Sequence, residues 1–189
     1  MEHHQLIEAI KKNNVEMVSS ILKENPNILN DKTKYMTMPL NFACDSSRSN
    51  PKIVQILIDN GADVNEKNKN DHGRTPLSYA CNESNAEVVK ILLDSGADAN
   101  ATDDDRWTPL LIACDDPNPI IIKMLIDKKA DVNYNGVFLR NPWKMITRKD
   151  NPNPEIMKML FDAGVIVYDV KYMTNDAKKN LSELIRDHK

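Results

Sequence analysis

Three cysteines recur at matched positions and are the first candidates for metal or redox chemistry. Cys44, Cys81 and Cys114 each follow an alanine in a similar short motif, so they occupy the same place in successive segments. If these segments are stacked helices, they lie about 8–10 Å apart, beyond the Cα separation of about 7 Å that limits a disulfide. We therefore expect three reduced cysteines that pack as small apolar residues between neighbouring segments.

Histidine, the commonest general acid or base, is scarce in this sequence. Only His3, His4, His72 and His188 occur, and none lies at ligand spacing from a cysteine or another histidine inside the folded region. We expect the His3-His4 pair to be solvated. No glycine-rich phosphate loop, Gly-x-Ser-x-Gly elbow or His-Glu-x-x-His motif is present. The sequence predicts a protein that is not an enzyme and has no cofactor and no metal.

An acidic run is the remaining candidate for cation binding. Asp103, Asp104 and Asp105 are consecutive, and Asp115 and Asp116 follow shortly after them. An EF-hand loop needs alternating ligands, a central glycine and a terminal glutamate, and this run does not have that order. We expect a solvated loop, with a share in a binding surface as the alternative.

Composition and charge limit the classes of partner. The chain has 189 residues, a formal net charge of −3 and a pI of about 5.8, whereas general binders of nucleic acid or anionic membranes are usually basic. No apolar run approaches the roughly 18 residues that span a bilayer, and the first residues contain no apolar signal core. Together with the odd number of cysteines, these features predict a cytoplasmic location, in the protein's own cell or in a host cell.

Two motifs repeat in step along most of the chain. Leucines that open the first motif stand at Leu22, Leu57, Leu92, Leu125 and Leu160, in steps of 35, 35, 33 and 35 residues. The first motif is clearest at residues 57–65, 92–100, 125–133 and 160–167, and the second occupies 38–44, 75–81, 108–114 and, in a worn form, 141–146.

Each repeated segment predicts a pair of helices and a projecting turn. Thr75 and Thr108 are N-cap residues followed by proline at the first helical position, where a missing N–H costs nothing. A second apolar-periodic segment follows in each unit, and Gly61 and Gly96 end it in a left-handed conformation. An extended polar segment then leads to the next unit.

The Thr-Pro-Leu-x-x-Ala motif, together with the Gly-Ala-Asp-Val-Asn motif, resembles the ankyrin repeat. The resemblance covers roughly residues 4–167. It implies an all-α solenoid of stacked helix pairs with projecting β-turn or hairpin fingers. The single predicted domain has an N-terminal cap (1–29), repeats at 30–64, 65–99, 100–132 and 133–167, and a C-terminal helical cap (168–189) with Ala177, Leu181, Leu184 and Ile185 on one face.

Departures from the family pattern predict reduced stability. Lys129 stands where the pattern has glycine, and a left-handed residue other than glycine costs on the order of 1 kcal/mol. The histidine that usually follows Thr-Pro-Leu is replaced by Asn41, Ser78, Leu111 and Lys144.

The resemblance implies that a partner binds the concave face formed by the fingers and the first helix of each pair. Matching positions are acidic in the middle and basic at the C-terminal end, where Arg140, Arg148 and Lys149 occur. Aromatic residues, favoured as interface anchors, also occupy these turns, whereas Phe42, Tyr79, Trp143 and Phe161 are expected in the core. The predicted partner-binding residues are Tyr35, Asp71, Arg74, Glu83, Asp104, Asp105, Trp107, Asp115, Asp116, Phe138 and Arg140.

These observations predict a non-catalytic protein–protein interaction module whose partner presents a basic surface or peptide. Two alternatives stay open: an inhibitor that occludes a partner enzyme or factor, and a secreted effector that acts on host proteins. An enzyme or a metal-dependent protein is the least favoured class. We expect a monomer that binds neither nucleic acid nor membranes.

Overall fold

The computed structural model of this protein describes residues 2–29, 38–45, 49–137, 140–167 and 170–188. Within these ranges the chain forms helices and no strands, with one isolated antiparallel bridge between Asn68 and Arg74. The first helices of the pairs are α1 (Glu2–Lys11), α3 (Pro39–Cys44), α5 (Pro76–Asn82), α7 (Pro109–Asp115) and α9 (Pro142–Thr147). The second helices are α2 (Val15–Glu24), α4 (Pro51–Asp59), α6 (Ala86–Asp94), α8 (Pro119–Asp127) and α10 (Pro154–Asp162).

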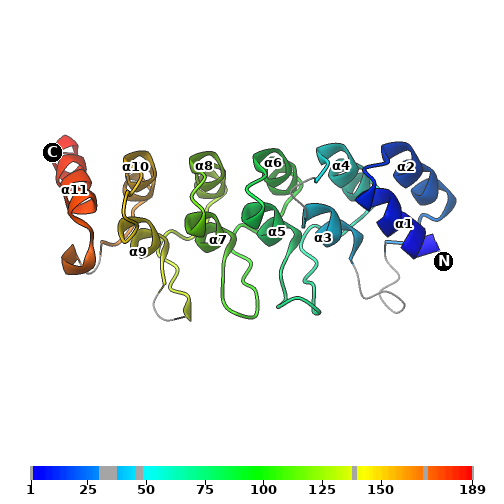
Figure 1. Ribbon diagram of the computed structural model, residues 1–189, viewed down its shortest axis with the longest axis horizontal. Coiled ribbons are helices and arrows are strands. Elements are labelled where there is room, and N and C mark those ends of the chain that lie inside the picture. Colours follow the sequence, from blue (N-terminus) through cyan, green and yellow to red (C-terminus); the bar gives the residue numbers. More distant parts are fainter. Residues whose placement is uncertain (1, 30–37, 46–48, 138–139, 168–169, 189) are drawn as a thin grey trace.

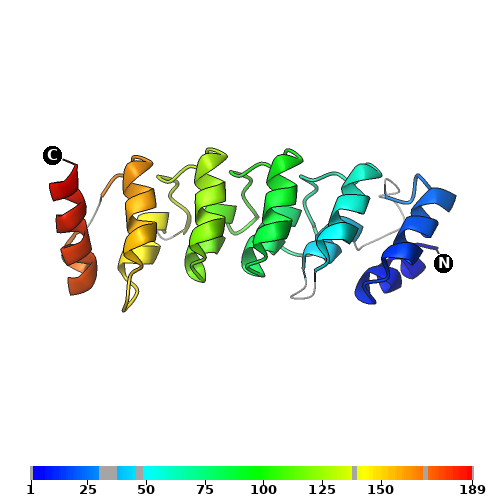
Figure 2. The ribbon, with the colours of Figure 1, turned by 90° about the horizontal axis from the view of Figure 1, so that it is seen from above.

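The helix pairs stack into one elongated row. Each first helix packs against its own second helix and against the first helices of neighbouring units, and the second helices form a parallel series of contacts. Helices α3, α5, α7 and α9 lie beside the projecting loops, whereas α4, α6, α8 and α10 lie on the far side (Figure 1). The termini lie at opposite ends of the row (Figure 2). The predicted all-α solenoid is therefore confirmed.

Side-chain caps fix where the helices begin. Thr75 accepts the N–H of Ser78 at 3.3 Å, and Thr108 accepts the N–H of Leu111 at 3.2 Å, as the sequence predicts. The second helices use asparagine instead. Asn85 caps α6 by accepting the N–H of Val88 at 3.2 Å, and equivalent asparagines cap α2, α4, α8 and α10.

Left-handed residues end the second helices. Gly61 and Gly96 have φ values of 88° and 90°, and Lys129 adopts φ 66° at the matching position after α8. The predicted left-handed lysine is therefore present, at a cost on the order of 1 kcal/mol relative to glycine.

An asparagine ladder ties the second-helix ends of successive units together. Asn100 accepts the N–H of Asp131 at 2.7 Å and donates to the carbonyl of Lys129 at 3.0 Å. Asn65 and Asn133 make the same pair of bonds to the units that follow them. In each asparagine, both the oxygen and the nitrogen of the side-chain amide bond to backbone atoms of the next unit. The ladder therefore sets the spacing of the units without depending on the side chains of that next unit.

The core is continuous through the stack. Cys44, Cys81 and Cys114 are buried free thiols, and burial raises the pKa of all three, that of Cys114 to about 12. These thiols therefore pack as apolar groups, as expected. Tyr79 and Trp143 are buried too, whereas Phe42 and Phe161 are only half-buried at the edge of the core.

The two ends of the stack differ from expectation at single residues. His3 is only 6% exposed on the inner side of α1, so the prediction of a solvated pair is wrong for this residue, and only His4 is exposed. At the other end, a short 3-10 turn, η2 (Val170–Tyr172), leads into α11 (Asn175–Asp187).

Helix α11 packs against α10 and covers the last repeat. It buries Ala177 and Leu181, with Leu184 half-buried, as predicted. Ile185 is 45% exposed, so its predicted place on the covered face is wrong. Among the described residues, no helix combines the length and the apolar character needed to cross a membrane.

Candidate functional site

Short loops that precede α5 and α7 form the fingers of the middle units. In the first finger, residues 68–74, the N–H of Asn68 donates to the carbonyl of Arg74 at 2.9 Å. In the second, residues 103–107, the N–H of Asp103 donates to the carbonyl of Trp107 at 3.0 Å. The Trp107 N–H donates back to Oδ1 of Asp103 at 2.8 Å. Each finger is thus closed by hydrogen bonds between its own residues, independently of its contacts with neighbouring fingers.

The two fingers also bond to each other. The N–H of Asp104 donates to the carbonyl of His72 at 2.8 Å, and Nδ1 of His72 lies 3.0 Å from Oδ2 of Asp105. Gly73, with φ 65°, lies so close that a Cβ there would be 2.5 Å from Oδ1 of Asp104. The fingers therefore form one continuous surface rather than independent loops.

The base of the first finger is fixed to α5 by a buried phenol. The hydroxyl of Tyr79 donates to Oδ2 of Asp71 at 2.6 Å and accepts from Nδ2 of Asn68 at 2.9 Å. Burial and the bond to a carboxylate raise the pKa of Tyr79, which keeps its proton in place. The carboxylate of Asp71 thus already accepts a hydrogen bond from within the protein.

An acidic pocket of about 170 Å³ lies between the fingers and the ends of α5 and α7. Arg74 and Trp107 come from the fingers, and the Nε atom of Arg74 is buried without a hydrogen-bond partner in the described part of the chain. The pocket is lined by Arg74, Asn82, Asp103, Asp105, Trp107, Ile112, Asp115 and Asp116.

A basic pocket of about 490 Å³ adjoins it on the C-terminal side of Trp107. The guanidinium carbon of Arg140 lies 5.1 Å from the centre of the Trp107 ring, so cation and indole form one wall. Trp107 and Asp115 line both pockets. The basic pocket is lined by Trp107, Asp115, Arg140, Lys144, Met145, Arg148 and Lys149.

The cations of the basic pocket are held by aromatic rings and a carbonyl. Arg148 lies 5.6 Å from the centre of the Tyr172 ring, and Nζ of Lys149 donates to the backbone carbonyl of Asp115 at 2.6 Å. In the described ranges, Arg140, Arg148 and Lys149 form no ion pair with a carboxylate. Within the described residues their charges are therefore not neutralised by an ion pair, and the three side chains line the basic pocket.

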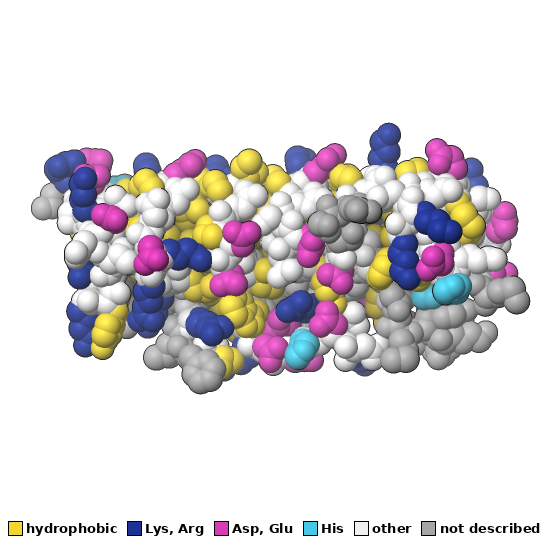
Figure 3. All heavy atoms as spheres, in the orientation of Figure 1, with side chains coloured by type: hydrophobic (Ala, Val, Ile, Leu, Met, Phe, Trp, Pro, Cys, Tyr) yellow, Lys and Arg dark blue, Asp and Glu magenta, His cyan; other side chains and the backbone are white. Residues whose placement is uncertain are grey.

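Charge separation along this face is visible on the surface (Figure 3). Asp and Glu side chains gather over the middle units, and Lys and Arg side chains over α9 and its finger. Burial raises the pKa of Asp45, and the negative charges of Glu83 and Asp71 add to this increase. Asp45, Asp71 and Glu83 therefore lie close enough for their negative charges to repel one another.

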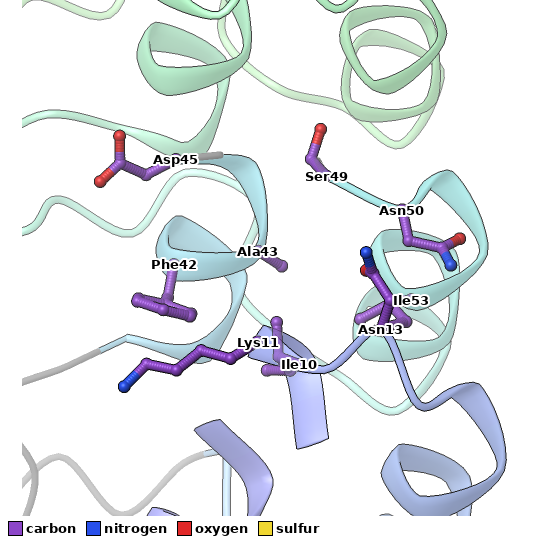
Figure 4. Close-up of a pocket in the computed structure, with 9 residues that line it drawn as sticks. All are labelled: Ile10, Lys11, Asn13, Phe42, Ala43, Asp45, Ser49, Asn50 and Ile53. Carbon is purple, nitrogen blue, oxygen red and sulfur yellow. The ribbon is translucent and has the colours of Figure 1, made fainter. Parts of the chain in front are cut away.

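A third pocket, of about 140 Å³, lies between the N-terminal pair and α3 and α4. Figure 4 shows Lys11 alongside Phe42, with Asp45 at the other end of the pocket. The ammonium of Lys11 lies 5.7 Å from the centre of the Phe42 ring. Among the described residues, none of the predicted partner-binding positions lines this pocket, so it lies apart from the two pockets at Trp107.

The structure brings six of the predicted partner-binding residues, Trp107 among them, together in these two adjoining pockets. Five line the acidic pocket and Arg140 lies in the basic one. Asp71, Glu83 and Asp104 lie outside both linings, and Tyr35 and Phe138 lie outside the described residues. The six are Arg74, Asp105, Trp107, Asp115, Asp116 and Arg140.

Asp103 departs from its expected place in a solvated loop. It is only 6% exposed and accepts the Trp107 N–H, so it shapes the finger from inside. Burial raises its pKa. Ile112, Lys144 and Met145 also line the pockets but were not predicted on this face, and helical spacing from Asp115, Asp116, Arg148 and Lys149 was the available signal.

Within the described ranges, no group of three or more His, Cys, Asp or Glu side chains is arranged so that it could hold a metal ion. A search of curated proteins gives no match to this chain.

The family model for ankyrin repeats matches in three copies, at residues 4–68, 66–136 and 88–173. Ankyrin repeats are generally protein–protein interaction modules, and proteins that contain them are typically non-catalytic. The matches extend over most of the chain and coincide with the stacked helix pairs, which shows that this chain belongs to the ankyrin-repeat family.

Proposed function

We propose that this protein is a non-catalytic interaction module that binds a protein partner along the face formed by its fingers and first helices. One observation carries the proposal. A single pocket is lined by residues that were predicted to bind a partner. They come from two fingers and from the C-terminal end of α7, and include Arg74, Trp107 and Asp116. A partner that docks there contacts two successive units at once, which is the advantage of a repeat surface.

The charge of the acidic pocket favours a basic segment of the partner. Asp115 and Asp116 are exposed, and within the described ranges their carboxylates form no ion pair. Held near Asp105, they repel one another, so a lysine or arginine side chain that enters the pocket relieves this repulsion. The partly exposed indole of Trp107 supplies the apolar contact that such an interface needs at its centre.

The test is quantitative affinity capture from the native cell or host, with the wild-type protein and an Asp115→Asn/Asp116→Asn variant as parallel baits. We expect a set of proteins that wild type enriches and the variant loses, because asparagine keeps the shape but removes the charge. The matched control is Asp59→Asn/Asp127→Asn, at exposed positions on second helices, far from the fingers. Equal capture by all three baits would contradict binding at the acidic pocket.

The captured partner also separates a scaffold from an inhibitor. If the partner is an enzyme, its activity in the complex shows whether this module occludes it, and proteins captured only from host cells identify a host-directed effector. We propose that the protein acts as a monomer in the cytoplasm, consistent with three buried free thiols.

A further inference from the structure

The acidic and the basic pocket adjoin each other and share one wall, the indole of Trp107. Together they form a continuous groove with opposite charges at its two ends. The acidic pocket lies on one side of Trp107 and the basic pocket on the other. Arg140, stacked on the indole, belongs to the basic side. A partner segment that crosses this wall therefore meets carboxylates and guanidinium groups in succession.

We infer that this groove binds an extended partner segment carrying both charges, with a lysine or arginine in the acidic pocket and an aspartate or glutamate in the basic pocket. This inference rests on the proposed function and specifies its partner. The cations Arg140, Arg148 and Lys149 have no carboxylate partner among the described residues, so a partner carboxylate supplies the missing countercharge.

The anion assigned to the basic pocket is a side-chain carboxylate. The carboxylate of Asp115 lines the basic pocket together with the cations. It opposes any anion that enters, and in a partner that is a protein the anionic side chains at neutral pH are carboxylates. Long polyanions meet the same opposition, because Asp105, Asp115 and Asp116 continue the groove on the other side of the indole.

The repeat distance sets the spacing of the two charges in the partner. The pockets lie between successive first helices, α5–α7 and α7–α9, which pack about 8–10 Å apart. In a polyproline II segment, residues three apart lie on the same side and about 9 Å from each other. The two charged residues are therefore expected three positions apart in the partner.

Apolar side chains between the pockets define the residues in between. Ile112 lies in the acidic pocket, Met145 in the basic pocket, and Trp107 stands between them. At least one of the two intervening partner residues is therefore apolar, because it rests on this strip and removes it from water.

The test is selection of short random peptides displayed on phage against the wild-type protein at low ionic strength. We expect enriched sequences with one basic and one acidic residue three positions apart and an apolar residue between them. A synthetic peptide of this kind should lose affinity at least several-fold when its acidic residue becomes lysine, as measured by fluorescence anisotropy.

Charge reversal in the protein decides which pocket binds the acid. The Arg140→Glu/Arg148→Glu variant should prefer the lysine-substituted peptide over the original, reversing the wild-type order. The Lys23→Glu/Lys179→Glu variant is the matched control: it changes the net charge equally at exposed positions on α2 and α11 and should keep the wild-type order. Circular dichroism of both variants verifies that the helices remain intact.

The outcomes separate this inference from the proposed function. Enriched peptides with only basic residues, insensitive to charge reversal at Arg140 and Arg148, would overturn the bipolar segment and leave the interaction module standing. Failure to enrich any peptide also overturns the linear segment, whereas the module is judged by whether capture depends on Asp115 and Asp116. A wild-type preference for the lysine-substituted peptide would likewise contradict the inference.

Discussion

Asp103 illustrates what a single residue does inside a run of like charges. Asp104 and Asp105, which follow it, are exposed, whereas Asp103 turns inward and accepts the backbone N–H of Trp107. A local backbone bond of this kind competes successfully with hydration because it closes the finger. The carboxylate is nevertheless buried, and burial raises its pKa.

The pH dependence of the free energy of unfolding should reveal the cost of burying the Asp103 carboxylate. Because the pKa of Asp103 is higher in the folded protein than its ordinary value of 3.8, the folded state holds the proton to a higher pH. Its contribution to stability is therefore fully present below pH 3.8 and is lost as pH rises through the raised value. We expect Asp103→Asn to remove this loss, since the amide oxygen still accepts the Trp107 N–H.

Urea denaturation between about pH 3 and pH 7 measures the effect. The free energy of unfolding of Asp103→Asn, relative to wild type, should rise with pH across this interval. Asp116→Asn, at an exposed position, is the control for loss of one charge. A difference between Asp103→Asn and wild type that stays constant with pH would show that Asp103 titrates alike in the folded and unfolded chains.

At the scale of elements, the contact between fingers should depend on the missing side chain of Gly73. Gly73→Ala meets two costs: a positive φ, worth on the order of 1 kcal/mol, and a clash with the Asp104 carboxylate. Gly61 also has a positive φ, but a Cβ there would meet nothing within 4 Å. Gly61→Ala therefore measures the backbone cost alone.

We expect Gly73→Ala to destabilise the fold by about 1 kcal/mol more than Gly61→Ala, because Asp104 must shift and its bond to His72 is disturbed. Chemical denaturation of both variants gives the difference. The excess should shrink in Gly73→Ala/Asp104→Ala relative to Asp104→Ala. Equal effects of the two glycine substitutions would show that the fingers tolerate separation.

The last helix offers a second comparison at this scale. Leu181 is buried against the final repeat, whereas Ile185, one turn further along α11, is 45% exposed. Leu181→Ala should cost about 2–5 kcal/mol by leaving a cavity, and Ile185→Ala should stay within about 0.5 kcal/mol of wild type. Thermal denaturation followed by circular dichroism measures both. Similar melting temperatures for the two variants would mean that α11 does not cap the stack.

Across the whole molecule, the sequence predicts repetition better than detail. The steps between Leu57, Leu92 and Leu125 are sufficient to predict stacked pairs, because each unit must bury the same apolar face against the next. The buried places of His3 and Asp103 could not be predicted in this way. They depend on which side of a short loop or a terminal helix meets the core, and periodicity does not specify that.

For the candidate site, too, the sequence predicts which residues share a face but not how they contact one another. Placing Trp107, Asp115 and Arg140 on one face follows from the repeat register alone. That Trp107 divides two pockets of opposite charge depends on the stacking of Arg140 and on the bend of a finger through Asp103. These contacts arise between units, so they appear only when the stack is assembled.

The opposed charges of the groove should make association with a partner depend strongly on salt. The Debye length falls from about 30 Å at 0.01 M to about 8 Å at 0.15 M, which is shorter than the span of two units. We expect the association rate constant to fall several-fold over this interval, while the dissociation rate changes less, because steering acts before contact is made. Stopped-flow or surface-based kinetics with the captured partner measures both rates.

In Asp115→Asn/Asp116→Asn the association rate constant should depend less steeply on salt concentration, because the charges that steer the partner are removed. A wild-type association rate that does not change with salt would mean that apolar contact at Trp107, rather than charge, brings the partner in.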